Sequence, residues 1–164
     1  MIIARTIAGA ALLAIAVSAP IEAHPARQPL GPTREETVAL RQASMVMAAA
    51  TTGNVKAALE RGAPAKAQTF ALRGVAKWAE NFSALFAPST RGVAGSRAKP
   101  EIWTDRTAFW SRATALSTAT KAAVRAAEAD DKAALTTAMT AVSDACKGCH
   151  DTFQVPPPPP AKTP

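Results

Sequence analysis

Apolar residues recur at alternating three- and four-residue intervals along several stretches of the chain, a pattern typical of amphipathic helices. The most regular stripe lies near the C-terminus, in a helix that we expect to begin at Asp130 or Asp131, because aspartate is a favoured N-cap residue. Its members are Leu135, Met139, Val142, Cys146, Cys149 and Phe153. This last helix is therefore predicted to face the core along its whole length.

The first predicted helix starts at Thr33. Residues 33–36 read Thr-Arg-Glu-Glu, which matches a capping box with threonine at the N-cap and Glu36 three residues later. We expect this helix to run to about Thr52, where Gly53-Asn54 interrupts it, with a further turn or two reaching Arg61-Gly62.

Two further helices are predicted between these ends. The second runs from about Pro64 to Phe86 and stops before Pro88, and its apolar stripe consists of Ala71, Val75, Trp78, Phe82 and Leu85. A loop of Gly, Ser, Thr and Arg covers 89–99. The third begins near Pro100, a residue suited to the first helical position, and runs to about Ala129 with Ile102, Phe109, Ala113 and Leu116 on one face. Short connections between long helices imply an all-α, antiparallel four-helix bundle.

The two ends of the chain are predicted to lie outside the bundle. Met1 to Arg5 carries one positive charge, an uncharged apolar run follows, and Ala23 ends a short polar stretch, which is the layout of a signal peptide. We assign residues 1–23 to that signal, 24–155 to the bundle, and 156–164 to a disordered proline-rich tail. The apolar run is shorter than a membrane span requires, so no stable span is expected after signal removal.

Composition supports helices and narrows the range of partners. Hydrophobic residues make up 48% of the chain, alanine dominates them, and tyrosine is absent, which favours helix over sheet. Two cysteines are too few for a disulfide scaffold. The net charge is +7, but the basic residues are scattered, so we expect no nucleic acid partner and consider an acidic protein as the partner of this surface.

The sequence Cys146-Lys147-Gly148-Cys149-His150 is the attachment motif for a c-type haem. Thiols three residues apart share a helix face, so each can form a thioether to one vinyl group, and His150 can bind the iron. A thioredoxin-like pair would need a βαβ context, and a structural zinc site would need four ligands. A disulfide between the two cysteines would leave the stripe unexplained. One haem c per chain, set inside the bundle, is therefore predicted.

A haem motif on the last helix of an exported, alanine-rich bundle resembles the class II c-type cytochromes, the cytochrome c′ family. The resemblance covers about residues 35–153. It is carried by 41–45 (Arg-Gln-Ala-Ser-Met), 86–90 (Phe-Ala-Pro-Ser-Thr), 100–103 (Pro-Glu-Ile-Trp), the haem motif and Phe153.

This resemblance implies roles for particular residues. Cys146 and Cys149 would hold the haem and His150 would be the proximal ligand of the iron. Arg41 would lie beside a haem propionate. Met45 matches the distal position over the open face of the iron, and Phe86 would line the same pocket. The family usually has Arg or Lys four residues after the proximal histidine, whereas this chain has Gln154 there.

The sixth coordination position of the iron decides which function is expected. Met45 as a sulfur ligand would give a low-spin haem suited to electron transfer. Met45 as a packing residue would leave a five-coordinate iron able to bind nitric oxide or carbon monoxide. Met47 lies about 200° from Met45 around the helix, so only one of the two methionines can face the haem. Both interpretations of Met45 stay open.

We predict a periplasmic electron carrier with a redox partner protein, and the alternative is a protein that binds nitric oxide or carbon monoxide. An enzyme is not expected, because a peroxidase needs distal acid–base groups and the only other histidine, His24, precedes the bundle. The resemblance also implies a homodimer formed through the first two helices.

Overall fold

The structure is a computed structural model that describes residues 31–157, so the predicted signal peptide and residues 158–164 of the predicted tail lie outside the described residues. Four long helices dominate: α1 (Arg34–Glu60), α2 (Thr69–Asn81), α4 (Arg106–Glu128) and α5 (Lys132–Phe153). A short helix, α3 (Glu101–Thr104), precedes α4, and three 3₁₀ turns lie at Ala65–Gln68, Phe82–Leu85 and Pro88–Thr90. No helix within this part of the chain is long and apolar enough to cross a membrane.

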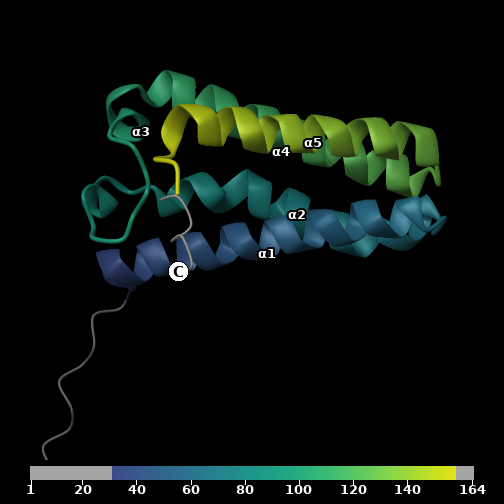
Figure 1. Ribbon diagram of the computed structural model, residues 1–164, viewed down its shortest axis with the longest axis horizontal. Coiled ribbons are helices and arrows are strands. Elements are labelled where there is room, and N and C mark those ends of the chain that lie inside the picture. Colours follow the sequence, from purple (N-terminus) through teal and green to yellow (C-terminus); the bar gives the residue numbers. More distant parts are fainter. Residues whose placement is uncertain (1–30, 158–164) are drawn as a thin grey trace, which may run out of the picture. The chain divides into compact units, whose positions relative to one another are not determined.

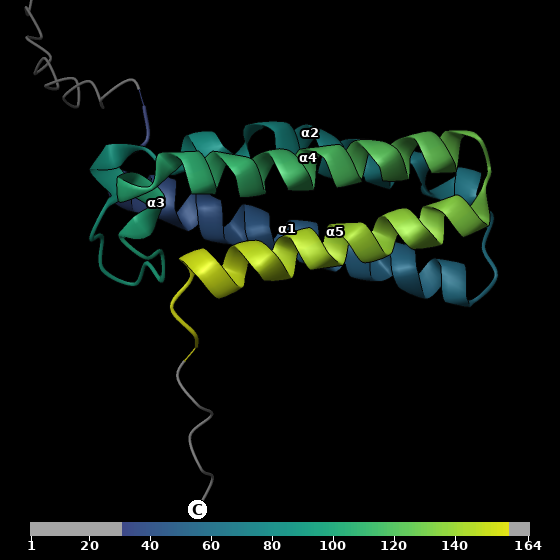
Figure 2. The ribbon, with the colours of Figure 1, turned by 90° about the horizontal axis from the view of Figure 1, so that it is seen from above.

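The long helices lie side by side as an antiparallel four-helix bundle, which confirms the predicted fold class (Figures 1 and 2). The α1–α2 turn and the α4–α5 turn lie at the same end, where the Lys66 backbone N–H donates to Asp130 Oδ1 at 2.8 Å. The longer connection between α2 and α4, which includes α3, closes the opposite end.

Helix α1 confirms the predicted start and corrects the predicted interruption. Thr33 N–H donates to Glu36 Oε2 at 2.7 Å and Glu36 N–H donates to Thr33 Oγ1 at 3.1 Å, completing the capping box. The helix continues through Gly53-Asn54 without a break. A glycine inside a helix costs about 1 kcal/mol, whereas burying Val55 and Leu59 just beyond it stabilises the helix by about 1.5–3 kcal/mol per side chain.

The second and third predicted helices differ from the structure at their ends. The second is α-helical only over α2, with a tighter 3₁₀ turn on each side. The third is divided at Asp105, whose backbone is not helical (φ −118°, ψ 69°) and whose side chain accepts a hydrogen bond from the Ala108 N–H at 3.0 Å. Asp105 is therefore the N-cap of a new helix, as Asp131 is for α5, where it accepts from Ala134 N–H at 2.9 Å.

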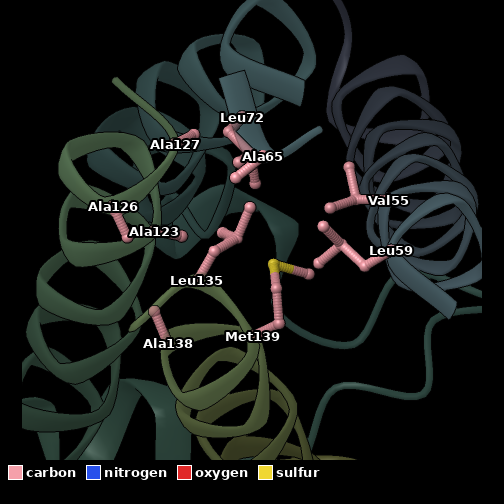
Figure 3. Close-up of a cluster of buried hydrophobic side chains, with 10 residues drawn as sticks. All are labelled: Val55, Leu59, Ala65, Leu72, Ala123, Ala126, Ala127, Leu135, Ala138 and Met139. Atoms are coloured by element: carbon pink, nitrogen blue, oxygen red, sulfur yellow. The ribbon is translucent and has the colours of Figure 1, made fainter. Parts of the chain in front are cut away.

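The core is built differently at the two ends of the bundle. Near the two turns, small and aliphatic side chains from every long helix meet in one cluster (Figure 3). Its members are Val55, Leu59, Ala65, Leu72, Ala123, Ala126, Ala127, Leu135, Ala138 and Met139. Towards the other end the core becomes aromatic, with Phe82, Phe109 and Phe153 each about 3% exposed.

The end of α5 is fixed to the α2–α4 connection by backbone pairing. Ala98 and Gln154 form an antiparallel bridge, Lys99 N–H donates to Phe153 O at 2.9 Å, and Val155 N–H donates to Arg97 O at 2.8 Å. The helix ends at Phe153, as the following prolines predict. This pairing holds the last turns of α5 in place, and those turns carry the cysteine–histidine motif.

Candidate functional site

A cavity of about 310 Å³ lies among the four long helices, and this volume is typical of sites that hold an organic ligand. Its walls are mainly apolar, and Phe82 from the turn after α2 adds to them. The lining residues are Met45, Ala48, Ala49, Thr52, Gly53, Lys56, Val75, Trp78, Phe82, Arg112, Leu116, Val142, Ser143, Cys146, Cys149 and His150.

The motif on α5 opens onto this cavity with all three of its reactive side chains. Cys146 and Cys149 are free, half-buried thiols, and burial raises the pKa of both. Burial lowers the pKa of His150, Arg97 lowers it further, and Asp151 acts in the opposite direction. The neutral imidazole is therefore favoured, which is the form that binds a metal ion.

Helix α1 supplies the opposite wall. Met45 lies in this wall, whereas Met47 is on the other side of the helix and is 70% exposed, as their spacing predicts. The wall between Met45 and Lys56 consists of small side chains, since Ala48, Ala49, Thr52 and Gly53 occupy it. A broad, flat group can therefore approach the backbone of α1.

Two observations show that the cavity suits a haem. A Cβ atom added to Gly53 would meet nothing within 4 Å, so open space adjoins the α1 backbone. Trp78 Nε1 is buried and has no hydrogen-bond partner among the described residues, which is costly unless a bound group supplies an acceptor. Paired thiols and a neutral imidazole complete the donor set of a c-type haem site.

Among the described residues, the cavity wall carries positive side chains and no carboxylate. Lys56 Nζ donates a hydrogen bond to Ser143 Oγ, which lies one turn before Cys146. Arg112 of α4 lines the cavity next to the motif. Lys56 and Arg112 therefore face the motif from two different helices.

Arg41 and Phe86 are not part of the cavity wall. Arg41 is 5% exposed and donates from Nη1 to Leu85 O at 3.2 Å and from Nη2 to Ser96 Oγ at 2.8 Å. Its guanidinium carbon also lies 4.3 Å from the centre of the Phe86 ring. The guanidinium of Arg41 is thus hydrogen-bonded to neutral acceptors in the connection after α2. The propionate role of Arg41 and the pocket role of Phe86 stay predictions.

The wall also contains residues that were not identified from the sequence as site residues, among them Lys56, Trp78 and Arg112. Lys56 lies four residues after Thr52 and therefore shares a helix face with Thr52 and Met45. The break expected at Gly53 concealed this pattern. Arg112 lies four residues before the buried Leu116 and three after Phe109, so its position on the inward face of α4 could have been inferred.

A family model described as "Cytochrome C'" matches residues 36–154. The cytochrome c′ of Pararhodospirillum photometricum is 37% identical over 75 residues, which cover 46% of this chain and 60% of that protein. The match to the cytochrome c′ of Rhodospirillum rubrum spans 56% of that relative. The chain therefore spans less than two thirds of these two relatives. The Rubrivivax gelatinosus cytochrome c′ is 29% identical over 121 residues, 73% of this chain and 94% of that protein.

Solved structures show the same architecture. The crystal structure of the Rubrivivax gelatinosus cytochrome c′ has a TM-score of 0.69 at 28% identity and covers 75% of this chain and 98% of that one. A ferrous variant of the Alcaligenes xylosoxidans protein with bound nitric oxide has a TM-score of 0.70 at 26% identity, covering 77% and 99%.

Proposed function

Because the chain belongs to the cytochrome c′ family and binds one c-type haem, we propose that Cys146 and Cys149 hold the haem covalently and that His150 is the axial ligand of its iron. The observation that carries this assignment is that all three side chains open onto one cavity from one face of α5. The capped start of α5 and the paired backbone after Phe153 keep that face in place.

We propose electron transfer in the periplasm as the function of this site, supported by the predicted signal peptide over residues 1–23. When bound, the haem supplies a reversible one-electron couple. The apolar walls surround the half-buried thiols of the motif, and the lowered pKa of His150 keeps its imidazole available to the iron. We assign no enzymatic activity, because the described wall offers only Lys56 and Arg112 as titratable groups besides the motif.

Binding of nitric oxide or carbon monoxide is a second candidate function. The apolar cavity beside Met45 favours it. A relative of the same fold has been described with bound nitric oxide. Hydrogen-bond donors and steric access in the distal pocket decide which ligands a haem accepts.

Met45→Ala is expected to separate these two functions, since the side chain either binds the iron or covers it. If its sulfur is a ligand, the wild-type spectrum is low-spin and unmoved by carbon monoxide, and the variant loses both properties. If the side chain only packs, the wild-type spectrum is high-spin and shifts with carbon monoxide. Optical spectra of the oxidised and reduced holoproteins, with and without carbon monoxide, measure this difference. Met47→Ala, on the exposed face, is the matched control and should leave every spectrum unchanged.

We propose two protein partners for the folded chain. The net charge of +7 and the absence of carboxylates from the described cavity wall favour an acidic redox partner. Electrostatic attraction would guide such a partner to this positively charged protein. A second copy of the chain fits the outward face of α1, where Leu40 and Met47 are 53% and 70% exposed. Glu36 lies in the first turn of α1 and Arg61 caps its C-terminal end, so two antiparallel copies would place opposite charges near each other.

Met47→Glu is expected to convert the dimer into a monomer, because two buried carboxylates would then meet near the centre of the interface. Sedimentation or light scattering of the holoprotein measures the mass. Trp110→Glu, at a 45% exposed position on α4 and outside the first two helices, is the control and should leave the mass unchanged. A wild-type chain that is monomeric at high micromolar concentration would contradict the homodimer.

A further inference from the structure

Arg112 packs directly against the haem motif from α4. A Cβ atom added to Gly148 would lie 3.2 Å from Arg112 Nη1 and 3.8 Å from its guanidinium carbon. Such a Cβ contact is tighter than an ordinary van der Waals separation. The glycine in the middle of the motif thus leaves the space in which the guanidinium lies, and a side chain there would require the guanidinium to shift by a few tenths of an ångström.

No described residue neutralises the positive charge of Arg112. In residues 31–157 its side chain has neither a salt bridge nor a hydrogen bond, although the helix that it faces carries Asp151. That carboxylate instead forms an ion pair with Lys147, with 2.5 Å between Nζ and Oδ2.

We propose that Arg112, held in the space left by Gly148, keeps a positive charge beside Cys149 and His150 and thereby raises the reduction potential of the haem iron. This inference rests on the proposed attachment of haem at Cys146, Cys149 and His150. It assigns the cation on the His150 side of the haem to Arg112 of α4, since the residue that follows α5 is the uncharged Gln154.

The sign of the effect follows from electrostatics. Oxidation adds one positive charge to the haem, and a nearby cation disfavours the oxidised state, so the reduction potential rises. Arg112 is an exposed residue, and its influence is therefore reduced by solvent and by salt. The effect should weaken as ionic strength increases, which a change in packing alone would not do.

The test compares Arg112→Gln with wild-type holoprotein by redox titration at low and high salt. At a fixed ambient potential we expect the ratio of reduced to oxidised protein to fall about three- to tenfold, or roughly 30–60 mV for a one-electron couple. Arg112→Lys keeps the positive charge, so its reduction potential should stay close to that of the wild type. Arg125→Gln, roughly 20 Å further along α4, is the matched control and should show almost none.

Gly148→Ala provides an independent test, since its methyl group displaces the guanidinium without removing it. We expect a smaller shift in the same direction, and no further shift when Gly148→Ala is added to Arg112→Gln. Equal potentials for wild type, Arg112→Gln and Arg125→Gln, with haem covalently bound in all three, would overturn the role of Arg112 alone. A wild-type protein that lacks covalent haem would overturn the proposed function and this inference together.

Discussion

Serine at both Cys146 and Cys149 is expected to abolish covalent retention of haem while the bundle stays folded. In the proposed attachment each thiol adds across a vinyl double bond, so that sulfur bonds to one carbon and the thiol hydrogen to the other. A serine hydroxyl is far less nucleophilic and leaves the haem held only by His150 and by packing. Both thiols are half-buried, and serine fits the same space.

Haem staining after denaturing electrophoresis measures the loss, and circular dichroism confirms that the helices remain. Each single variant should keep one thioether and therefore retain the stain. Ser143→Ala, on the same face of α5 one turn before Cys146, is the control and should retain haem fully. Haem that stays with the denatured double variant would disprove the assignment of the two cysteines.

Local sequence signals predicted the parts of the fold that depend on near neighbours. The capping box at Thr33, the N-cap at Asp131 and the stripe on α5 each involve residues within one or two turns, and the structure confirms them. The interruption expected at Gly53 was wrong, because tertiary burial beyond it outweighs the weak helix propensity of glycine. Asp105 was missed as a cap because the residues around it continue a helical pattern.

Only part of the site was predicted, again because sequence spacing shows which near neighbours share a helix face. The motif residues are adjacent in sequence and lie on one helix face, so their meeting in one cavity follows from spacing alone. The surroundings of Arg41 depend on where the connection after α2 lies, since that loop supplies its hydrogen-bond acceptors. The contact between Arg112 and Gly148 joins two helices, and no local pattern shows which residues of two helices will touch.

Phe109→Ala is expected to cost about 3–5 kcal/mol of unfolding free energy, because the aromatic end of the core is organised around this side chain. It is 3% exposed, and its ring centre lies 5.0 Å from that of Phe86 and 5.6 Å from that of Phe153. Phe153 is the last residue of α5, so Phe109 joins α4 to the end of the helix that carries the motif. The cavity left by alanine would therefore loosen both the bundle and the haem site.

Urea unfolding of the holoprotein, followed by circular dichroism, measures this cost. Trp110→Ala is the matched control: the indole is the next residue on α4 but is 45% exposed, so we expect a loss of about 1 kcal/mol or less. Equal losses for the two variants would mean that the aromatic cluster does not anchor this end of the bundle. A much larger loss for Phe109→Ala, together with a changed haem spectrum, would show that the same packing both holds α5 and positions His150.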